Sequence, residues 1–363
     1  MKTKNYIRQV VGIDVSLERL DVCLSVLDEL AVPHIIASTK FDNNASGINL
    51  LMDWIKRKRI DDTPLQVVLE ATAVYHERVA HTLYNKGYDI AIVMPVKIKH
   101  FCNSTNMRSI TDKISARQIA EFGLLKTLKN WKPSDPVIRN LRNLMRERST
   151  LQDERTMVKN QMHALRTGYD DLTEAIKRSE KRIKIINQQI SQIELDVKSI
   201  LNDSKNDWLK AKIKKIITIP GVAFITAVGI IAETDGFNLI HSSRQLVCYA
   251  GYDVIIKESG SSVKKKTKIS HRGNKYLRKL LYFPALSAKT HNPLVSAYYD
   301  RLFDRQQIKM QTYVAIQRKL LVLIYTLWKK DEEYNPNFIW TGKAVKSSGK
   351  NQFISNSLSD RKG

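Results

Sequence analysis

Residues 9–15 read QVVGIDV and residues 21–26 read DVCLSV, and these two runs set the fold class of the amino-terminal part of the chain. Both are short and rich in valine, isoleucine and leucine, which suit a pleated, half-buried strand. Turn-forming residues lie between them, around Ser16 to Arg19, so the pattern predicts two paired β-strands. The first run carries a carboxylate, Asp14, near its end.

Strands and helices alternate along the segment that follows. The spacing of apolar residues predicts a helix over 46–57, a buried strand over 65–69, a second helix over 74–85 and a further strand over 89–93. Alternation of this kind is typical of an α/β layer domain. We therefore expect an α/β domain over residues 1–130, followed by the proline-containing linker WKPSDP.

Long helices are expected over residues 137–205. Apolar residues recur every seven positions in the first half and with 3–4 spacing in the second: Leu144, Leu151, Val158 and Leu165, then Ile183, Ile186, Ile190, Ile193, Val197 and Ile200. Sustained heptads favour a coiled coil, either folded back within one chain or formed between chains. An ordinary helical pair packed on its own domain remains an alternative, because Arg148 and Arg155 occupy positions of the expected seam.

The carboxy-terminal part divides into a helical region and a polar tail. Residues 206–335 have the pattern of a mostly helical domain. Residues 336–363 are polar and poor in apolar side chains, and we expect them to be disordered. The expected fold class is therefore α/β followed by α.

The chain is strongly basic. Its 363 residues include 60 Lys and Arg against 36 Asp and Glu, which gives a formal net charge of +24. A charge of this size implies a polyanionic partner, either a nucleic acid or an anionic membrane surface. Hydrophobic residues make up 43% of the chain, which excludes a wholly disordered protein.

Membrane and secreted classes fit the sequence poorly. The amino-terminal residues lack the apolar core of a signal peptide, and the longest uncharged run, 216–232, is interrupted by a Pro-Gly pair. Cys23, Cys102 and Cys248 show no CxxC spacing and favour a reducing cytosol over a disulfide framework or a zinc site. We therefore expect a protein of the bacterial cytosol with a nucleic-acid partner and no membrane.

Three acids occupy positions at which metal ions are often held. Asp14 and Glu70 each end an apolar strand, and Asp112 opens a helix. Carboxylates from separate elements hold Mg²⁺ in sites that activate a nucleophile at phosphate. Structural alternatives exist for Asp14 as a turn residue and for Asp112 as a helix N-cap, whereas glutamate is a poor turn former.

A second candidate site lies in the basic segment 257–279, which holds nine Lys or Arg residues and one acid. A charge run is usually a solvated face, but the interspersed glycines and serines suit a loop that grips phosphates. The expected nucleic-acid contacts are Lys264, Lys265, Lys266, Lys268, Arg272, Lys275 and Arg278. Ser259 lies in this loop; it is either a turn residue or a nucleophile activated by a metal ion or a base.

The sequence IPGV at 219–222 precedes an apolar run. It is similar to one half of a helix-hairpin-helix, in which a glycine lets backbone amides approach a phosphate at a helix amino terminus. A plain buried helix is the alternative.

Taken together, these motifs resemble a known family. GIDVS, Glu70 in LEATAVYHE, Pro95-Val96-Lys97 and TDKISARQIA resemble the amino-terminal domain of DEDD transposases. These are the insertion-sequence family numbered one hundred and ten, together with the Piv-type DNA invertases. IPGV, AETDGF, QLVCYAGYD, ESGSS and ISHRGNKYLRKLLYFPA resemble that family's transposase domain in order and spacing, so the resemblance extends to about residue 330.

The resemblance implies an amino-terminal domain that is RuvC-like, with the RNase H fold, in which four acids coordinate Mg²⁺. Asp14, Glu70 and Asp112 match the first three acids. The family pattern T-D-x-x-D-A appears here as TDKISA at 111–116, so Ser115 stands at the fourth position. A serine hydroxyl is a weak metal ligand and adds no negative charge.

For the basic segment, the resemblance implies that Ser259 is the nucleophile that joins covalently to DNA. It implies a DNA recombinase of an insertion element, whose composite site takes the acids and Ser259 from different subunits. The subunits would form a dimer or tetramer through the coiled coil. The implied partners are donor DNA, target DNA and a structured guide (bridge) RNA that pairs with both, and the implied cofactor is Mg²⁺.

Two other functions stay open. One is a structure-selective nuclease resembling Holliday-junction resolvases, in which water rather than Ser259 attacks the phosphate. The other is a non-catalytic nucleic-acid-binding protein, a decayed copy in which Ser115 marks the loss of metal binding.

We expect the recombinase to associate with the nucleoid.

Overall fold

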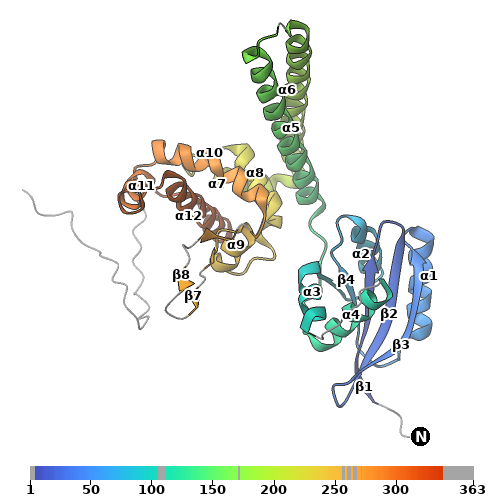
Figure 1. Ribbon diagram of the computed structural model, residues 1–363. Coiled ribbons are helices and arrows are strands. Elements are labelled where there is room, and N and C mark those ends of the chain that lie inside the picture. Colours follow the sequence, from blue (N-terminus) through green and yellow to red (C-terminus); the bar gives the residue numbers. More distant parts are fainter. Residues whose placement is uncertain are drawn as a thin grey trace, which may run out of the picture. The chain divides into compact units, whose positions relative to one another are not determined.

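The computed structural model describes residues 5–104, 112–170, 172–255, 258–259, 263–264, 268–270 and 272–337, with the backbone alone at 112–114, 258–259 and 263–264. The chain forms two compact units, Met1–Ser134 and Asp135–Gly363, and each is described by itself (Figure 1). The division falls within the proline-containing segment 131–136. Most of the expected polar tail, 338–363, lies outside the described residues.

The amino-terminal unit is built on a five-stranded sheet in the order β3-β2-β1-β4-β5. Its strands are β1 (Tyr6–Val15), β2 (Arg19–Asp28), β3 (Pro33–Asp42), β4 (Leu65–Glu70) and β5 (Ile90–Val93). β2 is antiparallel to β1 and β3, whereas β4 is parallel to β1 and β5. The predicted β1–β2 pair is confirmed, and Ser16 closes its turn through hydrogen bonds with Arg19.

Helices cover both faces of this sheet (Figure 1). The two pairs are α1 (Ala45–Lys58) with α2 (Tyr75–Asn85), and α3 (Pro95–Ser104) with α4 (Asp112–Leu125). Because side chains alternate along a strand, β1 gives Val11 and Ile13 to the α1 face and Val10 to the α4 face. The α/β class is confirmed, and the strand order fits the RNase H arrangement that the resemblance implied.

Two elements of this unit, β3 and α3, are absent from the sequence prediction. β3 is an edge strand whose side chains are all at least partly exposed, so it lacks the apolar run that marks β1. α3 begins at Pro95, which suits the first turn of a helix, but the helix buries Ile98 alone. Both elements therefore have a weak hydrophobic pattern.

In the carboxy-terminal unit, α5 (Pro136–Thr167) and α6 (Thr173–Asn202) form a helical hairpin (Figure 1). Asp135 caps α5 by accepting a hydrogen bond from the backbone nitrogen of Val137 at 2.8 Å. Successive side-chain pairs join positions that rise along α5 and fall along α6, namely Arg148–Glu194, Arg155–Asn187 and Arg166–Glu180. The helices are thus antiparallel, and the seam arginines reach across to α6.

The two ends of this helical hairpin are packed differently. In its outer part, Val158, Ile186 and Ile190 form a small buried cluster. Near its base, Met145 of α5 and Val197 of α6 belong to the main core of the unit. The pair is therefore folded back within one chain and packed on its own domain, whereas a coiled coil between subunits stays a prediction.

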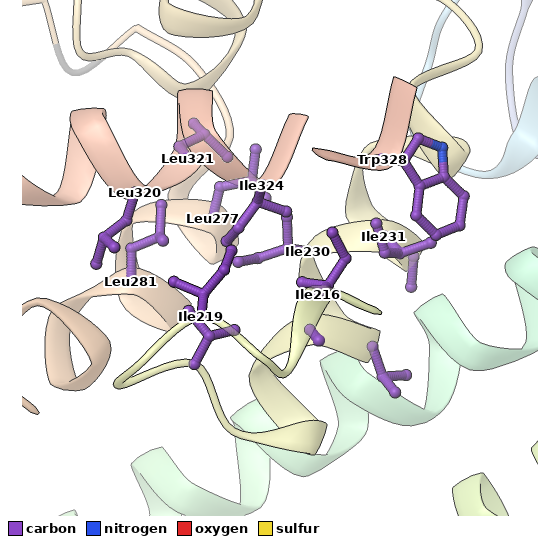
Figure 2. Close-up of a cluster of buried hydrophobic side chains, with 14 of the residues drawn as sticks. Ile216, Ile219, Ile230, Ile231, Leu277, Leu281, Leu320, Leu321, Ile324 and Trp328 are labelled. Carbon is purple, nitrogen blue, oxygen red and sulfur yellow. The ribbon is translucent and has the colours of Figure 1, made fainter. Parts of the chain in front are cut away.

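The rest of the described carboxy-terminal unit is mostly helical, as expected. Its helices are α7 (Asp207–Ile216), α8 (Phe224–Glu233), α9 (Ser243–Ala250), α10 (Lys275–His291), α11 (Pro293–Gln306) and α12 (Lys309–Lys330), with 3₁₀ turns at Ser204–Asn206 and Asp235–Phe237. Figure 2 shows their common core, to which Ile216, Ile230, Leu277 and Ile324 contribute from four helices. No helix in the described ranges is both long and apolar enough to cross a membrane.

The IPGV turn packs inside this core. Gly221 has a φ of +92°, and a Cβ there would lie 2.7 Å from the backbone nitrogen of Ala288 in α10. Glycine alone fits so close an approach with this backbone conformation. The turn therefore serves packing, and the buried-helix alternative describes α8 better than a phosphate-binding hairpin does.

Residues 253–270, here called the serine hairpin, contain short antiparallel ladders where the sequence predicts a loop. β6 (Val254–Ile255) pairs with β9 (Lys268–Ile269), and β7 (Glu258–Ser259) pairs with β8 (Val263–Lys264). Strands of two residues set among lysines carry too little apolar alternation to be predicted. The candidate nucleophile is thus on a β-ladder rather than in an irregular loop.

Candidate active site

Asp14 and Glu70 lie side by side at the carboxyl ends of two adjacent strands. β1 and β4 are parallel, with Ile13 in register with Leu69, so the residues that follow these two are also neighbours. Ile13 and Leu69 face α1 and α2, and side chains alternate along a strand, so Asp14 and Glu70 face α3 and α4. Both acids are partly buried.

Burial raises the pKa of the Glu70 carboxyl, and the neighbouring charge of Asp14 raises it further. Two carboxylates that share a partly buried site repel each other when both are ionised. A bound cation removes that repulsion, so the chemistry of this pair fits a divalent metal ion. Carboxylate oxygens in particular are the ligands that Mg²⁺ prefers.

Helix α4 begins at the same end of the sheet. Gly12 of β1 contacts the backbone of Ala116 and Ala120 so closely that any Cβ would overlap the helix, and Gly123 packs on Val10. Later residues of α4 therefore contact earlier residues of β1, which means that the helix is antiparallel to the strand. Its amino terminus lies toward the carboxyl end of β1.

Asp112 is the first residue of α4, and the partly buried Ser115 follows one turn later. The backbone thus brings the third predicted acid to the edge of the sheet that holds Asp14 and Glu70. Of Asp112 the structure describes the backbone alone. Among the described side chains, no three acidic, histidine or cysteine groups are close enough to hold a metal ion. A three-acid site therefore depends on Asp112.

Asp21 is a further acid on this face that the sequence analysis did not single out. It is in register with Asp14 across the β1–β2 pair, and its carboxylate lies 2.9 Å from Nζ of Lys40 on β3. Residues directly opposite in an antiparallel pair project to the same side of the sheet. The turn between Ser16 and Arg19 fixes this register, so counting outward from the turn is the signal that would have found it.

The acids also act on Cys102 of α3. Burial raises the pKa of the Cys102 thiol, and the charges of Glu70 and Glu121 raise it further. The raised pKa disfavours a nucleophilic role for this thiol. Glu121 itself accepts a hydrogen bond from Gln118 on the same helix at 3.2 Å.

Ser259 belongs to the carboxy-terminal unit, on β7 of the serine hairpin, where its backbone is in register with Val263. The cations predicted to contact nucleic acid are distributed around this hairpin. Lys264 is on β8, Lys268 is exposed on β9, Arg272 and Lys275 are exposed just after the hairpin, and Lys265 and Lys266 lie outside the described residues.

Arg278 differs from the other predicted contacts. It is partly buried, and its Nη1 donates a hydrogen bond to the backbone oxygen of Ala250 at 2.7 Å. Ala250 ends the helix that precedes the serine hairpin. Within the described structure Arg278 therefore supports the base of the hairpin.

Both candidate regions match known protein families. Residues 11–169, which include Asp14, Glu70 and Asp112, match a DEDD transposase family named for IS110. Residues 213–300, which include Ser259, match the family described as "Transposase IS116/IS110/IS902 family". The chain belongs to the IS110 transposase family. The two matches together cover about two-thirds of the residues of this transposase.

Relatives of this transposase include two gene-inverting proteins as well as a transposase. The pilin gene-inverting proteins of Moraxella bovis and Moraxella lacunata are each 25% identical over 327 residues, covering 90% of this chain and 97% of theirs. The transposase for insertion sequence element IS1111A of Coxiella burnetii is 23% identical over 282 residues, covering 70% of this chain and 75% of its own.

Among solved structures, RuvC of Thermus thermophilus is similar to part of this transposase. It has 12% sequence identity and a TM-score of 0.27, and the match covers 34% of this chain and 99% of RuvC. The structure of the same enzyme with a Holliday junction substrate gives a TM-score of 0.25. The strand order of the sheet, and not this likeness, defines the fold.

Proposed function

We propose that this transposase is a DNA recombinase that cuts and rejoins strands through Ser259 with the help of Asp14, Glu70 and Asp112. The observation that carries the proposal is the position of the acids. Asp14 and Glu70 are adjacent at the ends of β1 and β4, and α4 starts with Asp112 at that same edge. Ionised acids brought to one edge by three elements repel one another, and a shared metal ion would offset that repulsion.

The residues of the chain would perform the following chemistry. The hydroxyl oxygen of Ser259 attacks a DNA phosphorus and its proton passes to water, while the bond from phosphorus to one bridging oxygen breaks. The leaving oxygen takes a proton from water, so that DNA end departs as a hydroxyl. The product is a phosphodiester between Ser259 and the other DNA end. The hydroxyl of a second DNA end then attacks the same phosphorus and releases Ser259, so no bond energy is lost to hydrolysis.

Asp14, Glu70 and Asp112 would hold Mg²⁺. When bound, the ion polarises the scissile phosphate and stabilises the charge on the leaving oxygen. The positions of the three carboxylates would set where along the edge of the sheet the ion is held. Ser115 would add a neutral oxygen at the position of a fourth acid.

DNA and RNA are the proposed partners. The serine hairpin and the residues just after it present Lys268, Arg272 and Lys275 to solvent, and the chain carries a net charge of +24. Cations at this density bind phosphate backbones irrespective of base sequence. Base pairing with a guide RNA, which the family resemblance implies, would then supply the sequence specificity.

We further propose that the protein acts as a dimer or tetramer in which α5 and α6 join subunits. The helical hairpin leaves Met157, Ile185 and Leu195 exposed in the single chain. Exposed apolar side chains on a helix pair offer a surface for a second pair. The acids and Ser259 of one reaction would then come from different subunits.

The test uses a plasmid that carries the DNA flanking this gene, together with RNA transcribed from it. The wild-type protein with Mg²⁺ should yield a protein–DNA complex that survives denaturant and contains a phosphoserine at Ser259. Ser259→Ala should abolish the complex and all cleavage. Cleavage that persists in Ser259→Ala would instead identify the hydrolytic, resolvase-like nuclease.

A decayed copy is the second candidate, and Ser115 is the observation that favours it. It lies one turn into α4, where the family has an acid, and it leaves the site one negative charge short. If the copy is decayed, the wild-type protein forms no covalent complex and Ser115→Asp creates one. If the wild type is active, Ser115→Asp changes the metal concentration needed for activity but not the product.

A further inference from the structure

A buried carboxylate lies at the base of the serine hairpin. Glu233 is the last residue of α8, and its side chain is only 1% exposed. Its two oxygens accept hydrogen bonds from Nε and Nη2 of Arg146 on α5, at 2.8 and 3.0 Å. This two-point geometry fixes both the distance and the angle between the end of α8 and helix α5.

A third donor reaches Glu233 from the far end of the hairpin segment. Nδ2 of Asn274 donates to Oε2 of Glu233 at 2.6 Å. The same Asn274 uses its Oδ1 to cap α10, accepting hydrogen bonds from the backbone nitrogens of Tyr276 and Leu277. Asn274 thus joins the start of α10 to the carboxylate.

The near end of the segment is attached to the same residue. The hydroxyl of Tyr249 on α9 donates to the backbone oxygen of Glu233 at 3.0 Å. The backbone oxygen of Tyr249 in turn accepts a hydrogen bond from the backbone nitrogen of Asn274 at 2.8 Å. Both ends of the segment that carries Ser259 therefore meet at Glu233.

The two ends of the segment are also in direct contact with each other. A Cβ on Gly273 would lie 2.5 Å from the backbone nitrogen of Gly251, so the backbones on the two sides of the hairpin base are too close for any side chain at residue 273. Further out, the backbone nitrogen of Ser270 donates to Asp253 at 2.8 Å, and their side chains are also hydrogen-bonded. The two chain segments at the base of the hairpin are therefore held together at several points.

The partners of Glu233 lie at both ends of the hairpin segment, which separates it from an ion pair that joins two helices only. Burying a carboxylate is costly unless every lone pair finds a donor, and an apolar pair of the same size fills such a site more cheaply. Here the donors to the carboxylate come from α5 and the start of α10, and Tyr249 of α9 donates to the backbone oxygen of the same residue. The guanidinium of Arg146 is further held over the Tyr276 ring, 4.9 Å from its centroid.

We propose that Glu233 is a positioning residue that fixes the base of the serine hairpin against α5 and so sets where the hydroxyl of Ser259 stands. Its catalytic consequence rests on the function proposed above. The structural part does not, because it concerns contacts within the carboxy-terminal unit alone.

The test compares two glutamate substitutions in the full-length protein. Glu233→Gln keeps the size of the side chain but replaces one of its two acceptor oxygens by an amide nitrogen. Arg146 and Asn274 then have one oxygen to bind in place of two. Glu194→Gln is the matched control, since Glu194 accepts a hydrogen bond from Arg148, a neighbouring arginine of α5, and has no contact with the hairpin among the described residues.

Amide hydrogen exchange is the first measurement. Glu233→Gln should speed the exchange of the Ser270 and Asn274 amides by at least about tenfold, because their acceptors lie across the hairpin base. Amides inside α8 and α10 should keep their protection, and Glu194→Gln should change neither set. Unchanged exchange at Ser270 and Asn274 overturns the inference.

The rate of the Ser259–DNA complex under single-turnover conditions is the second measurement. Glu233→Gln should lower this rate by at least about tenfold while the Kd for DNA stays the same, which a general loss of stability would not produce. Faster exchange with an unchanged rate contradicts the positioning role. If the wild type forms no complex at all, the proposed function fails, and the exchange result alone decides the inference.

Asn274→Ser is the second variant, in case Glu233→Gln does not fold. Serine is as good an N-cap as asparagine, so α10 keeps its cap, while the donor to Glu233 is lost. The same increase in exchange and the same fall in rate are expected. A variant with wild-type values in both measurements would show that the contact to Glu233 has no positioning role.

Discussion

Glu70 lies beside Asp14 at the ends of two adjacent parallel strands, and burial together with the charge of Asp14 raises the pKa of the Glu70 carboxyl. The two acids are 56 positions apart in the sequence. Their proximity is produced by the crossover that places β4 next to β1. The repulsion between the two carboxylates is unfavourable in the metal-free protein, and a cation bound by both would make the arrangement favourable.

The raised pKa of Glu70 makes the stability of the metal-free protein depend on pH. A carboxyl whose pKa is higher in the folded state stabilises the fold below its unfolded value of 4.5, and this contribution is lost as the pH rises through the folded pKa. Glu70→Gln carries no charge. At pH 7 in chelator it should therefore melt at a higher temperature than the wild type, and the difference should shrink below pH 4.5.

The control for this experiment is Glu77→Gln, an exposed glutamate of α2. Because Glu77 is exposed, this substitution should not raise the melting temperature at pH 7. Added Mg²⁺ should raise the melting temperature of the wild type and remove the advantage of Glu70→Gln. A gain for Glu70→Gln that is equal at pH 4 and pH 7 would contradict the assignment of the shift.

Gly12→Ala tests the approach of α4 to β1. The added methyl would overlap the backbone of Ala116 and Ala120, so the helix must move away from the strand. Overpacking of this kind should cost about 2–3 kcal/mol and should weaken the response of the melting temperature to Mg²⁺, because Asp112 moves with α4. Thermal unfolding with and without Mg²⁺ measures both effects.

Gly87→Ala is the matched glycine variant in the same unit. Gly87 has a φ of +84°, but a Cβ there would meet nothing within 4 Å. The substitution should cost about 1 kcal/mol for the backbone conformation alone and should leave the Mg²⁺ response intact. Equal Mg²⁺ responses in the two alanine variants would argue against a role for the α4 position.

Two arginines of α5 should differ strongly in their contribution to stability. Arg146→Met leaves the buried Glu233 without its charge partner and should cost about 3 kcal/mol. Arg166→Met breaks a pair with Glu180 in which both side chains are 52% exposed, and should cost less than about 1 kcal/mol. Denaturant unfolding of the two variants checks this, and similar costs would mean that Glu233 finds another partner.

The exposed cations at the serine hairpin should contribute to DNA affinity through phosphate contacts. Lys268→Ala and Arg272→Ala should each weaken binding of unrelated DNA sequences alike, and each should lower the slope of log K against log salt by about 0.9. Lys181→Ala, an exposed lysine on the outer part of α6, is the control and should not change the slope. A sequence-dependent loss would point to base contacts instead.

The fold was predictable where the hydrophobic pattern is strong. β1, β2 and β4 appear within a few residues of the predicted bounds, because each is a run of apolar residues buried in the sheet. The edge strand β3 was missed because it is partly exposed along its length. The serine hairpin was missed because its strands are too short and too charged to leave a pattern.

The candidate site was predictable in part. Asp14 and Glu70 stand out because each ends an apolar strand, and strand ends are where sheets hold ligands. The packing of α4 beside these two acids could not be predicted from the sequence. It depends on a contact between Gly12 and a helix more than a hundred residues further along the chain. Glu233 was likewise hidden, because its partner Arg146 is 87 residues away.

The most direct test of the central claim is iron-directed cleavage of the polypeptide. Fe²⁺ that replaces Mg²⁺ reduces added hydrogen peroxide to hydroxide and a hydroxyl radical, with ascorbate regenerating Fe²⁺, and the radical cuts the backbone next to the bound ion. The three acids should produce cuts near residues 14, 70 and 112 in the same molecule, suppressed by excess Mg²⁺ and lost in Asp14→Asn. Cuts near residues 14 and 70 without any near 112, or cuts that persist in Asp14→Asn, would contradict a shared metal site.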